Sequence, residues 1–140
     1  METWTVRKLN AGDRIRVDRG SYFHHGIYIG GGEAVHFCAE DGDGITEPEK
    51  VEVRRTSMEE FARGSFCEVM ELSGDRKKRR KPQDAVEYAL KHIGQKGYDI
   101  LNYNCEHFAN ECVFFEGYSS IVDETRARVK GLFAKANKKG

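Results

Sequence analysis

The feature that most constrains the fold is a pair of short runs, HHGIYIG at residues 24–30 and EAVHF at residues 33–37, joined by glycines. Side-chain character alternates along both runs, which is typical of strands with two distinct faces. A glycine cluster between two such runs is a hairpin signal. The two runs therefore predict one antiparallel hairpin, and with it an antiparallel sheet.

The length of the turn decides which histidines meet, because a slip of one residue moves every side chain to the opposite face. A three-residue turn over residues 30–32 places Gly26 opposite His36 and keeps the apolar side chains together on one face. His24 and His36 then become diagonal neighbours, roughly 5 to 8 Å apart. Gly26 leaves a space opposite His36 where a second element docks. The two histidines are either a functional pair, or one buried and hydrogen-bonded residue and one exposed residue.

The other patterns predict a β-rich first half and a helical second half. Alternating or compact apolar runs predict further strands at residues 14–17, 50–55 and 67–72. Capping, proline and glycine signals predict helices at residues 57–63, 82–94 and 104–117. The fold class expected from this order is α+β, with an antiparallel sheet packed against helices.

The length of 140 residues predicts one domain, at residues 1–120, followed by a basic amphipathic tail or helix at residues 121–140. The formal net charge is +0, so no global field attracts nucleic acid. No signal peptide or transmembrane run is visible, so a cytoplasmic location is expected. The basic run at residues 76–81 and the tail are either solvated or make peripheral membrane contact. The oligomeric state is left open.

Cys105 is the cysteine with a chemical context. The four cysteines form no CxxC pair and have no zinc-type histidine spacing, so a structural metal is not expected. Cys105 falls in the first turn of the helix that begins near Asn104, where free N–H groups favour a thiolate and can bind an oxyanion. A free cysteine is also an ordinary core residue. His107 projects away from Cys105 and is expected to be structural, so a base for a nucleophilic Cys105 must come from elsewhere.

Three segments in this order, HHGIYIG at 24–30, VHF at 35–37 and NCEHFAN at 104–110, resemble the lecithin:retinol acyltransferase-like family. The resemblance covers roughly residues 10–117. It implies a permuted papain-like fold, close to that of the NlpC-type cell-wall peptidases, with a nucleophilic cysteine at a helix N-terminus.

The resemblance also implies a Cys–His–His site. Cys105 would be the nucleophile, His24 the general base and acid, and His36 the residue that orients His24. Tyr22 is expected to make a further polar contact in the substrate-binding region. Family members move fatty acyl groups from glycerophospholipids, through a cysteine thioester, to water, an amine, an alcohol or another lipid. A thiol-dependent acyltransferase or phospholipase A-type enzyme is therefore predicted, with a phospholipid or other acyl donor as substrate. This chemistry needs no metal or organic cofactor.

Two other functions stay open. The segment YDILNYNCEHF at residues 98–108 also resembles the cysteine segment of permuted deubiquitinase-type enzymes, which implies a thiol (iso)peptidase or amidase acting on peptide or ubiquitin-like substrates. Such enzymes work with a Cys–His dyad, so the need for His36 separates the two hypotheses. A binding module that keeps the fold without catalysis is the third hypothesis.

Overall fold

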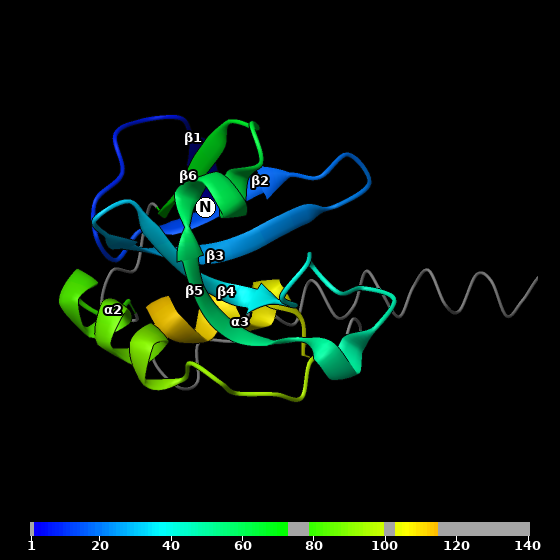
Figure 1. Ribbon diagram of the computed structural model, residues 1–140. Coiled ribbons are helices and arrows are strands. Elements are labelled where there is room, and N and C mark those ends of the chain that lie inside the picture. The colour runs from blue at the N-terminus through cyan, green and yellow to red at the C-terminus, as the bar shows by residue number, and fades with distance from the viewer. Residues whose placement is uncertain (1, 73–78, 100–102, 115–140) are drawn as a thin grey trace, which may run out of the picture.

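The computed structural model describes residues 2–72, 79–99 and 103–114, and Figure 1 shows their arrangement. Its strands form one six-stranded antiparallel sheet in the order β1-β6-β2-β3-β4-β5. They are β1 (Glu2–Thr5), β2 (Arg14–Asp18), β3 (Phe23–Gly30), β4 (Glu33–Cys38), β5 (Glu52–Ser57) and β6 (Cys67–Leu72). The predicted α+β class with an antiparallel sheet is confirmed.

The described helices are α1 (Met58–Ala62), α2 (Pro82–Lys91), α3 (Cys105–Val113) and the 3-10 turn η1 (Pro48–Lys50). α1 begins as the capping pattern predicts, because the Ser57 side chain accepts a hydrogen bond from the Glu60 backbone N–H. Proline occupies the first position of α2. None of the helices in the described ranges is long and apolar enough to cross a bilayer.

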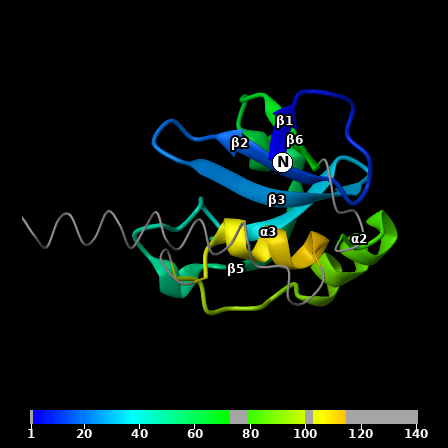
Figure 2. The ribbon, with the colours of Figure 1, turned by 180° about the vertical axis from the view of Figure 1, so that it is seen from behind.

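The sheet carries a hydrophobic core on each face. On one face α3 packs against β3 and β4, with Ile27, Val35 and Phe108 buried between them. The views in Figures 1 and 2 both place α2 beside α3. On the other face α1 inserts Phe61 beside Ile15 and the neighbouring apolar side chains of β2 and β6. These two surfaces are called the α3 face and the α1 face below.

The hairpin of β3 and β4 has the predicted register but a different turn. Ile27 pairs with Val35, which is the alignment that sets Gly26 against His36. The chain turns at Gly31 and Gly32, and Gly30 pairs with Glu33 after a shift in register. Both turn glycines have positive φ, as a two-residue hairpin turn of this kind requires. The bulge supplies the extra residue that the three-residue turn was expected to supply, so the histidine alignment survives.

Two features of the sheet, strand β1 and the burial of Arg14, have no counterpart in the sequence patterns. Strand β1 was not predicted; it pairs with the edge of β6. Arg14, on β2, is 0% exposed, and the centre of the Trp4 ring lies 5.1 Å from its guanidinium carbon. Residues 76–78 of the basic run and the tail at residues 121–140 lie outside the described residues, so their predicted roles stay predictions.

Candidate active site

His24 and His36 form a hydrogen-bonded pair on the α1 face. His24 Nε2 lies 2.8 Å from His36 Nδ1, and both side chains are almost fully buried. The ring of Phe61 covers them, with centroids 5.4 Å from His24 and 4.9 Å from His36. A Cβ at Gly26 would lie 2.7 Å from Phe61 Cε2, so the missing side chain is what admits this ring. The space expected opposite His36 is present, and α1 fills it.

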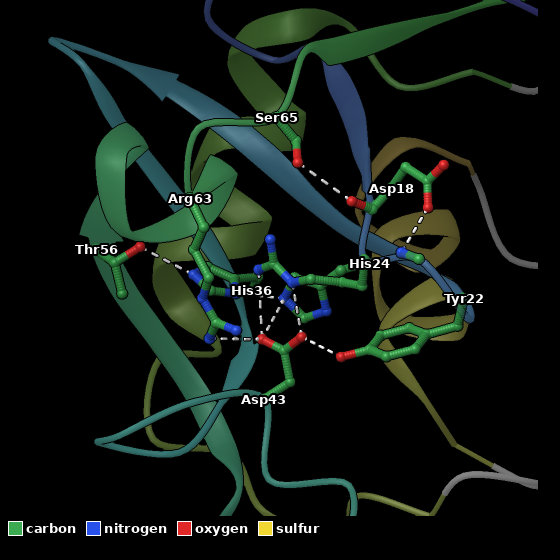
Figure 3. A network of polar contacts seen from close by, with 10 residues as sticks. Asp18, Tyr22, His24, His36, Asp43, Thr56, Arg63 and Ser65 are labelled. Atoms are coloured by element: carbon green, nitrogen blue, oxygen red, sulfur yellow. Dashed lines mark hydrogen bonds and ion pairs between the residues drawn. The ribbon is translucent and has the colours of Figure 1, made fainter.

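The carboxylate of Asp43 joins this pair to two arginines and a tyrosine (Figure 3). Asp43 Oδ1 lies 3.7 Å from His24 Nε2, and Arg19 Nε donates to Asp43 Oδ2 at 2.8 Å. The Tyr22 hydroxyl donates a hydrogen bond to the same carboxylate. Burial alone would raise the pKa of Asp43, but the bonds from Arg19 and Tyr22 and the nearby His24 hold that pKa well below its usual range. Asp43 is therefore an anion beside His24.

Both histidines of the pair are neutral at physiological pH. Burial lowers the pKa of His24 to about 4, although Asp43 partly opposes the shift. Burial also lowers the pKa of His36 well below its usual value. A neutral His24 has one ring nitrogen available as a base, and its Nδ1 atom makes no hydrogen bond with the described residues.

Cys105 is the first residue of α3, and Asn104 caps the helix. The Asn104 side chain accepts the backbone N–H groups of Glu106 and His107, and His107 completes the capping box. His107 is thus structural, as expected. Within the described chain, no acceptor takes the backbone N–H of Cys105, which leaves it available to an incoming oxyanion.

The thiol of Cys105 is protonated in the free protein. Burial raises its pKa to about 11, although a backbone hydrogen bond from His25 and the charge of Arg14 work against the shift. The sequence favoured a lowered pKa at a helix start, and burial outweighs that effect here. A nucleophilic Cys105 must therefore give its proton to a base as it attacks.

A cavity of about 610 Å³ opens at the start of α3, with Cys105, Tyr22, Phe23, His25 and Tyr98 among its lining residues. Tyr22 connects this cavity to the α1 face, because its hydroxyl reaches the Asp43 carboxylate beside His24. Asp43 also acts electrostatically on Cys105 and contributes to its raised pKa. Tyr22 and Asp43 thus link the cavity that holds Cys105 to the histidine pair on the α1 face.

His25 is the histidine on the α3 face and lines the same cavity as Cys105. Burial lowers its pKa strongly, and the charges of Arg14 and Arg16 lower it further. Its Nε2 atom lies 3.7 Å from the Glu106 carboxylate, and its ring stands edge-on to Trp4 at 5.8 Å. No chemical role was predicted for His25, and its position makes it the alternative base to be tested against His24.

The structure brings together predicted residues and residues that no pattern singled out. His24, His36 and Tyr22 share one polar network, and the Cys105 thiol forms no hydrogen bond with either histidine ring in the described residues. Asp43 was not singled out, although it stands between Gly42 and Gly44 in a run of acids, a pattern that indicates a tight loop. Among the described residues no cluster of three or more His, Cys, Asp or Glu side chains is arranged to hold a metal ion.

Comparison with known proteins identifies relatives along most of the chain. The family model described as lecithin retinol acyltransferase matches residues 7–117. The human protein named phospholipase A and acyltransferase 4 is 28% identical over 128 residues, covering 84% of this chain and 77% of the relative.

Mouse lecithin retinol acyltransferase is 26% identical over 147 residues, and the bovine protein is 27% identical over the same length. Each of these alignments covers 91% of this chain but only 64% of the relative, so the chain spans less than two thirds of their length. Acyltransferase or phospholipase activity in general is what these similarities support. The match over residues 7–117 shows that the chain belongs to the lecithin retinol acyltransferase family.

Proposed function

We propose that the protein is a thiol-dependent acyltransferase or phospholipase A-type enzyme that acts on glycerophospholipids through a Cys105 thioester. The observation that carries the proposal is the buried His24–His36 pair, in which His24 Nδ1 has no partner among the described residues. Tyr22 links this pair, through Asp43, to the cavity that Cys105 lines. The similarity to a human phospholipase A and acyltransferase supports the same chemistry. The permuted papain-like arrangement implied by the sequence is part of this proposal.

In the first half-reaction the Cys105 sulfur attacks the carbonyl carbon of a phospholipid ester, and its proton passes to His24 Nδ1. The backbone N–H of Cys105 stabilises the oxyanion that forms. The tetrahedral intermediate collapses, the bond to the glycerol oxygen breaks, and His24 returns the proton to this leaving oxygen. The products are an acyl thioester and a lysophospholipid.

In the second half-reaction water or an alcohol or amine attacks the thioester carbonyl. His24 accepts the proton of the attacking group and gives it to the departing Cys105 sulfur. The Asp43 carboxylate, 3.7 Å from His24 Nε2, stabilises the imidazolium that exists between the two proton transfers. The aromatic lining from Phe23 and Tyr98 gives the acyl chain an apolar surface beside the thiol.

The test is to incubate the protein with phosphatidylcholine vesicles and follow both the released lipids and the intact mass of the protein. We expect free fatty acid or acylated acceptor, and a hydroxylamine-labile acyl adduct on Cys105. Cys105→Ser should abolish turnover and the thioester. Cys112→Ser should retain both, since Cys112 is a buried residue of the same helix and lines no part of the cavity.

A ubiquitin-type and a peptide substrate are included in the same panel. Cleavage of either, without any fatty acid release or acyl adduct when an active phospholipase control works, would show the lipid assignment to be wrong and favour the (iso)peptidase.

A further inference from the structure

Thr56, on β5, ends the chain of hydrogen bonds that begins at His24. Its Oγ1 atom lies 2.8 Å from His36 Nε2, on the side of the ring opposite to His24. The same Oγ1 donates to the Ser57 carbonyl oxygen at 3.1 Å. We propose that Thr56 is a positioning residue that fixes the tautomers of both histidines and so leaves His24 Nδ1 unprotonated. This role rests on the function proposed above and deepens it.

The tautomers follow from counting protons along the chain. A hydroxyl has one proton to donate, and Thr56 directs it to the Ser57 carbonyl. Thr56 can then only accept from His36, so His36 carries its proton on Nε2. His36 is neutral, so its Nδ1 bears a lone pair and accepts from His24. His24 consequently carries its own proton on Nε2, and Nδ1 is the free base.

Asp43 supports the same assignment independently. Its carboxylate is an acceptor and lies 3.7 Å from His24 Nε2, so it favours a proton on that nitrogen over a lone pair. When Nδ1 takes a proton during the reaction, the Nε2 proton stays in place and the new positive charge faces Asp43. No proton has to travel through His36 or Thr56, which act only by orienting His24.

The site would lose its base if the hydrogen bond between His36 and His24 ran in the opposite direction. If His36 carried its proton on Nδ1, that proton would be donated to His24 Nε2, and a neutral His24 would then hold its proton on Nδ1. Nδ1 would be a donor and could not accept the Cys105 proton. Removing the Thr56 hydroxyl removes the group that prevents this arrangement, so Thr56→Val, which keeps the shape of the side chain, is the informative change.

The direct test is the ring-nitrogen NMR spectrum of the ¹⁵N-histidine-labelled protein near pH 7, which separates protonated from unprotonated nitrogens. Wild-type protein should show His24 and His36 both protonated at Nε2 and unprotonated at Nδ1. This measurement needs neither a variant nor a substrate, so it holds whether or not the proposed lipid reaction is correct. A His24 protonated at Nδ1 in wild-type protein overturns the proposal.

Two variants of Thr56 test whether the tautomers control the rate of Cys105 acylation. Thr56→Val should shift His24 towards the Nδ1-protonated form and lower the rate of Cys105 acylation by about 100-fold, the low end of what general-base catalysis supplies, with KM little changed. Thr56→Ser keeps the hydroxyl, so it should show the wild-type tautomers and an acylation rate within about threefold of the wild-type rate. A purely structural role of the Thr56 side chain predicts no such rescue. A Thr56→Val protein that keeps the wild-type tautomers, or that changes them without slowing acylation, contradicts the positioning role.

If Thr56→Val does not fold, Thr56→Ala takes its place in the comparison with Thr56→Ser, and the wild-type spectrum tests the tautomers without any variant. If wild-type protein has the expected tautomers but neither acylates Cys105 nor releases fatty acid, the function proposed above is wrong while the hydrogen-bond assignment stands.

Discussion

The two faces of strand β3 hold consecutive histidines in opposite surroundings. On the α1 face His24 bonds to His36 and lies beside the Asp43 carboxylate. On the α3 face His25 packs edge-on to Trp4, near the charges of Arg14 and Arg16. Both rings are buried and both have lowered pKa values, so burial alone does not distinguish them.

The difference lies in what each face does to an imidazolium. Burial and the charges of Arg19 and Arg63 lower the pKa of His24, although Asp43 raises it. For His25, burial and the neighbouring Arg14, His24 and Arg16 all lower the pKa, although the Glu106 carboxylate lies 3.7 Å from its Nε2 atom. A general base must accept a proton at the moment of reaction, so a neighbouring carboxylate assists it and neighbouring guanidinium groups oppose it. The contrast favours His24 as the base, although His25 lines the cavity with Cys105.

Matched glutamine variants test this contrast most directly. His24→Gln should lower kcat/KM for phospholipid turnover about 1000-fold, since it removes the general base, while His25→Gln should cost less than about tenfold. Steady-state release of fatty acid from phosphatidylcholine vesicles measures both. A larger loss of kcat/KM in His25→Gln than in His24→Gln would show that His25, on the α3 face, is the general base.

Asp43→Asn tests the stability of the α1 face. Asp43 and Arg19 form an ion pair whose side chains are only 6% and 7% exposed, so neutralising one partner leaves a buried charge unpaired. The free energy of unfolding should fall by about 3–5 kcal/mol. The matched control is Glu47→Gln, which removes an exposed, solvent-screened pair with Lys50 and should leave the free energy of unfolding nearly unchanged.

Urea unfolding at pH 7 measures both variants. Equal losses in the two proteins would mean that Asp43 is no more than a surface charge.

Gly26→Ala tests whether Phe61 needs the missing side chain. The new methyl group would lie 2.7 Å from Phe61 Cε2 and 3.2 Å from the Val35 carbonyl oxygen, so overpacking should cost about 1–3 kcal/mol. The loss should shrink in a Phe61→Leu background, which a double-mutant cycle of urea midpoints detects. An equal loss in both backgrounds would place the strain in the β3 backbone instead.

Acid should destabilise both faces, and the α1 face more, because it holds two of the three buried histidines. A histidine whose folded pKa lies below 6.5 binds fewer protons than in the unfolded chain, so stability falls as pH drops through 6.5. Between pH 7.5 and 5.5 each such histidine should cost about 1.3 kcal/mol, and His24, His25 and His36 together about 4 kcal/mol. His24→Gln and His25→Gln should each remove one histidine's contribution to this pH-dependent loss of unfolding free energy. An unfolding free energy independent of pH in this range would contradict the buried neutral state of all three.

Local pattern predicted most of the sheet because strands and caps leave signals within a few residues. The alternation at residues 14–17 and 67–72, the Ser57 cap and the start of α3 were all predictable. Strand β1 has four residues, too few for a period to stand out, and it forms because β6 offers an unpaired edge. The burial of Arg14 has no local signal because it depends on the Trp4 ring of another strand.

The sequence by itself determined which histidines can meet. Alternation along a strand and the number of residues in the hairpin place His24 and His36 on one face and His25 on the other, and this geometry is local to the backbone. Only the tertiary structure decided what each face touches. The Asp43 loop, Phe61 of α1, Thr56 of β5 and the start of α3 reach β3 through long-range packing, which has no local period in the sequence.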